Sequence, residues 1–489
     1  MKVLARRPRR QTTHTGTGTS TKTKANTPIG TVGTASGPVD IESYLHRFNT
    51  NAEVRTQVVA NFLDSFSPSP LIRDGKVGGV LHIGHTFPIF IGQSPVLDKA
   101  VTALSSAFLA KRSRDLHLLQ YSARLYGEAL QIVHGRIRSG RRCGQDSLFA
   151  TVFFQFYELI NSSPLGFKAW TSHVKGSNAI LGQYSDSSPP TVTDHLFWRQ
   201  LKFVTVCDAI GLRKSIYSYS SFWKRPALHN PWRESVDVIL DSIIECSALI
   251  EAVDFLIQHG HQDLQDDIQT GEKLLHGCLQ LKDHLDTSFC EMQARLGVPY
   301  SSPNQQPFWS TIDTSIPREV FPDAIEYPCL TCAESHLLWW TTYILLYPLI
   351  DQLLTFLGRS RSEISFNMWD IPSSSTAGTS SHSYDTWASE LPEDFLGVAD
   401  HYAGLICRSA KFLVQPETKA MGTQILLAPF SQATQFYHSR EAIEKYRWCQ
   451  SVFMVFSRLG FGIAPFLKDM IWPKYEAATK KKLPTSSSR

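Results

Sequence analysis

Apolar residues recur at helical spacing along most of the chain. Between residues 236 and 257 they stand three or four positions apart, which places them on one face of a helix. The same spacing predicts helices over 122–137 and 274–296, and 149–160 is apolar nearly all round, as in a buried central helix. The two-residue alternation of strands is scarce, and only 78–92 could be extended. The pattern therefore predicts an all-α fold built as a large multi-helix array.

The most apolar run of the chain is 337–350 (LLWWTTYILLYPLI), which contains Pro348 and is followed by Asp351. A bilayer requires roughly 20 apolar residues, and shorter runs are more often buried helices. We therefore interpret this run as core and expect no membrane partner. The N-terminus has no apolar stretch of the kind that directs secretion.

The pattern divides the chain into three parts. Residues 1–40, rich in Thr and Gly, are expected to form a disordered basic tail. Residues 41–472 form the helical domain, and 473–489 form a basic C-terminal tail. Loops rich in Ser and Pro interrupt the domain near 184–193, 299–328 and 372–385.

Charge is unevenly distributed along the chain. The net charge is +4, but residues 40–478 hold 37 basic against 44 acidic residues, because the tails are basic. An acidic body argues against a large DNA-binding face. The composition of the N-terminal tail suits nuclear import or phosphate contact. The alternatives are a mitochondrial transit peptide and a solvated tail that carries no targeting signal. The residues in question are Lys2, Arg6, Arg7, Arg9 and Arg10.

Nine cysteines are scattered through the chain, and one CxxC pair stands at Cys329 and Cys332. A structural zinc site needs a second pair at close spacing, and a redox pair needs a βαβ context. Neither surrounds this pair, so both thiols are interpreted as structural. We expect no unusually fast alkylation by iodoacetamide at this position.

Two histidines and three aspartates form a second candidate cluster, namely His259, His261, Asp263, Asp266 and Asp267. They could bind a metal, but a structural interpretation is simpler. Gly260 would end one helix, and the acids would lie near the start of the next, where the helix dipole favours them. Motifs for nucleotide binding, zinc proteolysis and serine hydrolysis are absent. No catalytic and no metal-ligating residue is assigned.

Aromatic and basic side chains alternate over residues 197–232. Such interleaving can bind single-stranded nucleic acid. It is more often a core stripe whose Lys and Arg side chains reach the surface, and the acidic surroundings favour the second interpretation.

Several segments, taken in chain order, resemble the fungal-specific transcription factor regulatory domain, the helical region that usually follows a zinc binuclear cluster. They are 62–72, 93–113, 123–133, 153–160, 170–181, 223–232, 403–429 and 447–467. One segment carries a Trp–His–Gly–Ala arrangement at Trp170, His173, Gly176 and Ala179, and another ends at Trp232. These are fold signatures, so the resemblance implies structural roles for Trp170, His173, Gly176 and Trp232.

One departure from the family pattern concerns DNA binding. Family members usually hold two zinc ions with six N-terminal cysteines, whereas the first cysteine here is Cys143. Either the regulator has no DNA-binding domain of its own, or an exon upstream of Met1 encodes one. No cofactor is expected, and zinc is expected only if such a cluster exists.

The resemblance implies a nuclear transcriptional regulator or co-regulator of a fungal metabolic or biosynthetic gene set. The helical domain would bind other transcription regulators or a second copy of itself, and the tail would bind nucleic acid weakly and without sequence preference. One alternative is a ligand-sensing or scaffold protein with Trp339 and Trp340 lining a pocket. A less favoured one is an all-α enzyme with a non-local active site. The cytoplasm and the mitochondrion are the alternative locations.

Overall fold

A computed structural model describes residues 52–68, 89–140, 143–161, 166–183, 191–224, 233–259, 264–303, 320–359, 392 and 394–472. Over these residues the chain forms thirteen α-helices and one two-stranded sheet. The prediction of an all-α fold is confirmed. The predicted tails 1–40 and 473–489 and the predicted loop 372–385 lie outside the described residues.

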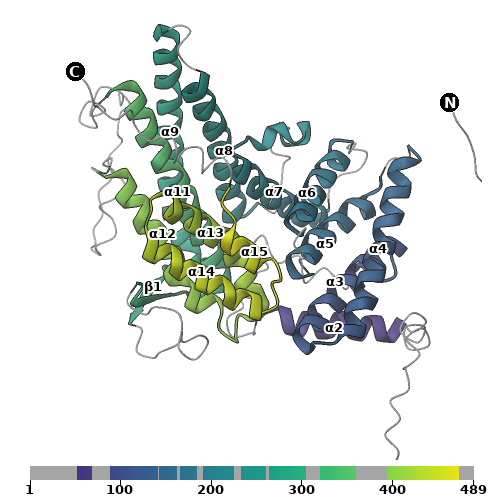
Figure 1. Ribbon diagram of the computed structural model, residues 1–489. Coiled ribbons are helices and arrows are strands. Elements are labelled where there is room, and N and C mark those ends of the chain that lie inside the picture. Colours follow the sequence, from purple (N-terminus) through teal and green to yellow (C-terminus); the bar gives the residue numbers. More distant parts are fainter. Residues whose placement is uncertain are drawn as a thin grey trace, which may run out of the picture.

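The first five described helices pack as an N-terminal group on one side of the molecule (Figure 1). They are α2 (Ala52–Phe66), α3 (Pro95–Ser113), α4 (Leu116–Arg138), α5 (Gln145–Asn161) and α6 (Gly166–Gly182). Local sequence marks their ends: Pro95 occupies the first turn of α3, where a missing N–H costs nothing. The side chain of Asp115 caps α4 by accepting a hydrogen bond from the Leu118 amide at 3.0 Å.

Helices α7 (Val192–Leu212) and α8 (Ser235–His259) lie between the two groups of helices (Figure 1). Helix α7 begins with a capping box, in which Thr191 and Asp194 each bond the backbone of the other. The short 3-10 helices η2 (Ile216–Ser218) and η3 (Ser221–Lys224) follow it.

The remaining helices form a C-terminal group on the other side of the molecule (Figure 1). They are α9 (Leu264–Leu296), α11 (Leu330–Leu357), α12 (Phe395–Leu413), α13 (Lys419–Ser439), α14 (Ile443–Arg458) and α15 (Ala464–Asp469). Helix α11 contains the apolar run with Pro348 and is buried along most of its length, as predicted. None of the described helices is both long and apolar enough to span a membrane.

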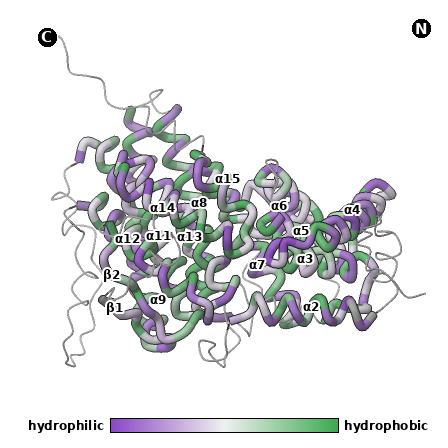
Figure 2. Tube along the Cα trace, turned by 60° about the horizontal axis from the view of Figure 1, so that its bottom comes forward, coloured by the Kyte–Doolittle hydropathy of each residue, from purple (hydrophilic) through white to green (hydrophobic). Residues whose placement is uncertain are grey.

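One continuous apolar core runs through both groups of helices. A separate small cluster consists of Trp170, Val174 and Val204, on α6 and α7. Hydrophobic and hydrophilic stretches alternate along the outer helices (Figure 2). This alternation is what helices with one buried face require.

The prediction of a loop over 299–328 is wrong at both ends of this range, because each end forms a β-strand. Strands β1 (Tyr300–Pro303) and β2 (Asp323–Glu326) pair antiparallel, with Tyr300 opposite Glu326. Ala324 and Ile325 are buried, and β2 packs against α12. Proline and serine are frequent in the stretch, but the β2 flank buries its apolar side chains when it pairs with β1, whereas Tyr300 of β1 is exposed. Residues 304–319 lie outside the described part of the chain.

Two other predicted segments differ from the structure in their boundaries or in their secondary structure. The loop 184–193 ends by Thr191, the N-cap of α7, and 184–190 lie outside the described residues. The segment 78–92 is described only from Ile89 onward, where it forms a turn and not a strand. Phe90 in this turn is buried against Phe149 and Phe197, and this contact secures the turn to the core.

Candidate functional site

Three of the four motif residues lie on one helix. Trp170, His173 and Gly176 are carried by α6, whereas Trp232 lies outside the described residues. Residues Lys2, Arg6, Arg7, Arg9 and Arg10, predicted to serve import or phosphate contact, also lie outside them. The structure therefore bears on α6 and its surroundings and not on the tail.

His173 ties α6 to α4 and α5 through two hydrogen bonds in series. Its Nε2 lies 2.7 Å from the hydroxyl of Tyr126, which donates to Glu158 at 2.6 Å. A phenol has one proton, so Nε2 of His173 must carry a hydrogen and donate to the Tyr126 oxygen. Burial and the Glu158 carboxylate raise the pKa of Tyr126, so the hydroxyl stays protonated. These contacts agree with the structural role that the resemblance implies for His173.

Gly176 is not required by close packing. A Cβ built at this position meets no heavy atom within 4 Å outside its own helix. Gly176→Ala is therefore expected to raise the free energy of unfolding by about 0.4–1 kcal/mol, because alanine loses less conformational entropy in a helix. Urea unfolding followed by circular dichroism would measure the change.

Gly422 provides the matched comparison for that substitution. A Cβ on Gly422, in α13, would clash with the Leu413 carbonyl oxygen at the end of α12. Gly422→Ala is expected to lower the free energy of unfolding by about 1–3 kcal/mol because the two helices must move apart. A loss of stability in Gly176→Ala would contradict the first prediction, and unchanged or increased stability in Gly422→Ala would contradict the second.

Trp170 lies in the wall of a cavity of about 240 Å³, which we call the α6–α13 cavity. Its lining comes from α5, α6, α7, α8, α11, α13, α15 and the residues just after α15. Most of the lining side chains are apolar, and they include Phe167, Phe203 and Leu427. Because both groups of helices contribute walls, the cavity lies where the two halves of the fold meet.

Backbone hydrogen bonds close one side of the α6–α13 cavity. The amides of Gly462 and Ile463 donate to the carbonyl oxygens of Ile160 and Leu159, each at 3.1 Å. These carbonyls belong to the last turn of α5 and have no partner within the helix. The C-terminal segment therefore completes the end of an N-terminal helix at the cavity wall.

The residues after α15 form another wall. Gln435 on α13 donates to the carbonyl of Met470 at 2.7 Å and accepts from the amide of Trp472 at 3.3 Å. The indole of Trp472 lies over Gly211, where an added Cβ would come within 3.4 Å of the ring. Gln435 therefore holds Met470 and Trp472 against α13 at the wall of the cavity.

The thiol of Cys207, which packs near Trp170, is not a nucleophile at neutral pH. Burial raises the pKa of the Cys207 thiol to about 12, so the sulfur keeps its proton. Burial also raises the pKa of Asp208, partly offset by hydrogen bonds from Tyr219 at 2.8 Å and Thr171 at 3.2 Å. The arrangement suits binding of a molecule better than covalent chemistry.

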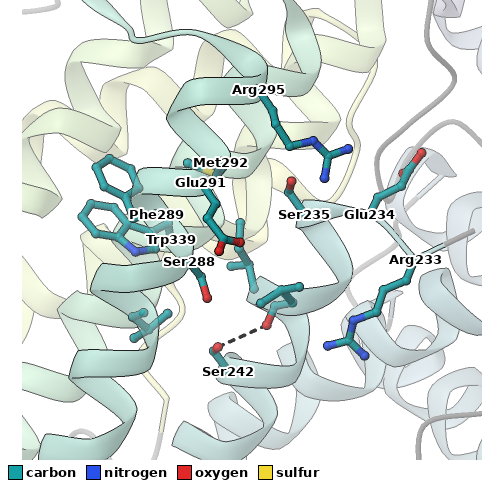
Figure 3. A pocket seen from close by; sticks show the side chains of 13 residues that line it. Arg233, Glu234, Ser235, Ser242, Ser288, Phe289, Glu291, Met292, Arg295 and Trp339 are labelled. Carbon is teal, nitrogen blue, oxygen red and sulfur yellow. Dashed lines mark hydrogen bonds between the residues drawn. The ribbon is translucent and has the colours of Figure 1, made fainter. Parts of the chain in front are cut away.

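A smaller pocket of about 190 Å³ opens between α8, α9 and α11 (Figure 3). Trp339 lines it, as predicted, and stacks on Phe289 with 3.6 Å between ring centroids. Trp340 does not line it and packs near Tyr327 and His336 instead.

Two charged side chains at this smaller pocket are already in ion pairs. Arg233 lies 2.9 Å from Asp241, and Glu234 lies 2.9 Å from Arg199. A ligand would compete with these pairs. We therefore regard the α6–α13 cavity as the stronger candidate site.

The CxxC pair has structural contacts. Cys329 caps α11 by accepting a hydrogen bond from the Cys332 amide, and the Cys332 thiol donates to the Gly297 carbonyl at 3.4 Å. Burial raises the pKa of Cys332 to about 12. These contacts agree with the structural interpretation of both thiols, and the expectation of slow alkylation stands.

The histidine–aspartate cluster is only partly described. His259 is exposed at the end of α8 and stacks on Phe255 of its own helix. Asp266 and Asp267 occupy the first turn of α9, as expected for acids at a helix N-terminus. Gly260, His261 and Asp263 lie outside the described residues. Across the described part of the chain, no group of three or more His, Cys, Asp or Glu side chains could hold a metal ion.

The aromatic and basic segment packs mainly inward. Trp198 and Phe222 are buried, and Arg199, Lys202 and Arg213 each form an ion pair with an aspartate of α8. These pairs neutralise the cations that would otherwise face a nucleic acid. Residues 225–232 lie outside the described part of the chain.

The polar residues of the α6–α13 cavity were not predicted from the sequence. Gln424 and Gln432 stand two helical turns apart on α13, and Gln200 lies on α7. A glutamine within an otherwise buried helix is a weak signal by itself. Glutamines become candidates for a binding site only when the tertiary structure shows that several of them, from helices remote in the sequence, line one cavity.

Comparison with known proteins adds no relative. No family model matches the sequence, and neither the curated proteins nor the solved structures include a match.

Proposed function

We propose that this protein is a transcriptional regulator or co-regulator of a fungal metabolic or biosynthetic gene set, and that its helical body responds to a small molecule. The observation that carries the proposal is the position of Trp170. This residue belongs to a segment that resembles fungal regulatory domains, and it forms a wall of the α6–α13 cavity. The other described segments of that resemblance lie on or beside helices that share one core.

The location of the cavity supports a regulatory role. A ligand there would touch α6 and α7 from one side and α13 and Trp472 from the other. A ligand that binds one arrangement of these walls better than another shifts the population toward it. Since the walls come from both halves of the fold, such a shift would change surfaces offered to other regulators or to a second copy.

The N-terminal tail would supply nuclear import and weak phosphate contact in this proposal. We expect the full-length protein to bind duplex DNA weakly, with little sequence preference. Replacing Arg6, Arg7, Arg9 and Arg10 with alanine should reduce the slope of log affinity against log salt by about 0.9 for each phosphate that the tail no longer neutralises. Fluorescence anisotropy at several salt concentrations measures the slope. A sequence-selective footprint that survives physiological salt would contradict the expectation.

A reporter assay tests the regulatory function directly. The full chain, fused to an unrelated DNA-binding domain in a fungal host, is expected to raise or lower transcription from a reporter that carries the matching sites. The DNA-binding domain alone is the control. Reporter output equal to that control, at confirmed protein abundance and in several nutrient media, would refute the proposed function.

A further inference from the structure

The surface that the α6–α13 cavity presents to a ligand is mostly carbon, although several polar residues belong to its lining. The side-chain oxygens of Gln200, Gln424 and Gln432 and the indole nitrogen of Trp170 are buried inside the walls. They are not accessible from the cavity, so a molecule in it cannot bond them.

The hydroxyl groups of the lining are already used by their own helices. Thr341 donates to the carbonyl oxygen of Leu337 at 2.7 Å, and Ser431 donates to that of Leu427 at 2.8 Å. A hydroxyl has one hydrogen to donate, so neither side chain has a second one for a ligand.

The charged residues of the lining do not form a binding site for an ion inside the cavity. Asp208 accepts hydrogen bonds from Thr171 at 3.2 Å and from Tyr219 at 2.8 Å. Lys175 is exposed, so its ammonium group is hydrated at the surface. A charged molecule would lose its own hydration inside the cavity and meet mainly carbon atoms, which is unfavourable.

Aromatic rings from remote parts of the chain line the same space. Phe167 and Trp170 lie on α6, Phe203 lies on α7, and Trp472 follows α15. Aromatic side chains bind a further ring through offset-stacked or edge-to-face contacts. Leu212, which also lines the cavity, is exposed, so the cavity reaches the surface and a molecule can enter.

We infer that the α6–α13 cavity binds an uncharged hydrocarbon-like molecule of about two fused rings, without polar groups at both of its ends. Water between such walls forms few hydrogen bonds, and its displacement by an apolar molecule is favourable. The inference rests on the site named in the proposed function and gives that site a ligand class, but binding is measured without any transcriptional readout.

The volume of the cavity sets the size of the ligand. A dry engineered cavity of about 150 Å³ binds benzene, and the α6–α13 cavity of about 240 Å³ is larger. It is smaller than the cavities of about 300–1,000 Å³ that usually hold drug-sized ligands. Two fused six-membered rings match this space.

The test compares naphthalene with 1,5-dihydroxynaphthalene by isothermal titration calorimetry on the full-length protein. The two hydroxyls of the diol lie on opposite sides of the ring system, so at least one must be buried in the cavity whichever end enters first. Naphthalene is expected to bind at one site per chain. The diol should bind at least about ten-fold more weakly, because a buried hydroxyl without a partner loses its bonds to water.

Two results would overturn the inference. Absence of saturable naphthalene binding up to the solubility limit would show that the cavity is no ligand site. Binding of the diol as tight as that of naphthalene, or tighter, would show that the cavity offers polar partners and takes another class of ligand.

Variants locate the site. Ala428→Trp fills the cavity from a half-buried position on α13 and should weaken naphthalene binding at least about ten-fold. Ala252→Trp is the matched control, because Ala252 is a half-buried helical alanine that does not line the cavity. Met470→Trp adds bulk from the opposite wall, at another half-buried position, and serves if thermal unfolding shows that Ala428→Trp does not fold. Unchanged naphthalene binding in a folded cavity-filling variant would overturn the inference.

The two proposals fail separately. Binding of naphthalene at this cavity with no reporter activity would refute the regulatory function and keep the ligand site. Reporter activity with no binding of naphthalene would refute the ligand site and keep the regulatory function.

Discussion

Replacing Arg199 with alanine is expected to lower the free energy of unfolding by about 3–5 kcal/mol, since the change leaves a buried carboxylate without its partner. Arg199 on α7 donates to both oxygens of Asp237 on α8, at 2.7 Å and 2.6 Å. It also donates to Glu234 at 2.9 Å. The side chains of Arg199 and Asp237 are only 4% and 10% exposed.

The position of this pair explains its large expected effect. The Asp237 carboxylate also accepts a hydrogen bond from the Glu234 amide at the start of α8, at 2.9 Å. Removing Arg199 therefore weakens both the contact between α7 and α8 and the first turn of α8.

Lys202 offers a matched control on the same pair of helices. It lies 2.7 Å from Asp241, but the two side chains are 24% and 37% exposed. Ion pairs near solvent contribute little, so Lys202→Ala is expected to cost less than about 1 kcal/mol. Urea unfolding of the two variants tests the difference, and equal losses would show that the buried pair has no special role.

The second large effect concerns His336, whose protonation is expected to destabilise the fold in acid. His336 is fully buried in α11, and burial lowers its pKa to about 4. Its Nδ1 lies 2.8 Å from the Cys332 carbonyl oxygen and donates to it, which leaves Nε2 as an acceptor without a partner among the described residues. Protonation would place a charge and an unpaired N–H at Nε2 among Phe289, Tyr327 and Trp340.

The direction of the pH effect follows from the pKa of His336 in the folded and in the unfolded chain. The unfolded chain binds a proton at this histidine near its usual pKa of about 6.5, whereas the folded chain binds it only near pH 4. Stability from neutral His336 is therefore complete above about pH 6.5 and is lost as the pH falls toward 4. At about 1.4 kcal/mol per pH unit, the loss amounts to about 3 kcal/mol.

His336→Phe isolates this contribution. Phenylalanine suits the aromatic surroundings and cannot be protonated, so the variant should lose about 3 kcal/mol less than the native protein between about pH 7 and pH 4. Burial also lowers the pKa values of His195 and His401, and their effect has the same sign in both proteins. Urea midpoints at about pH 7, 5.5 and 4 provide the comparison. Parallel pH profiles would show that His336 is not the responsible group.

Local patterns in the sequence predicted the helices well. The stripe over 236–257 became α8, and the run 337–350 lies inside α11. These predictions succeeded because helical spacing and end signals act within a few turns of chain. The hairpin of β1 and β2 was missed because its strands are far apart in the sequence and neither carries a clear alternating pattern.

The candidate site, like the fold, was predicted only in part from the sequence. The resemblance singled out Trp170, His173 and Gly176, and the structure gives them different roles: a cavity wall, a link between helices, and a position with free space. No pattern in the sequence pointed to Gln200 or Gln424, since a single glutamine in a buried helix does not reveal which space its side chain meets.

The sequence by itself determined the helical elements, their caps and the division into an acidic body with basic tails, because spacing, end residues and charge are properties of the chain order. Only the tertiary structure decided which charges pair and where an interior space remains. Arg199 meets Asp237, and Trp170 and Gln432 line one cavity, through contacts between segments remote in the chain. Packing of whole helices sets such distances, so the site emerges only when both halves of the fold are in place.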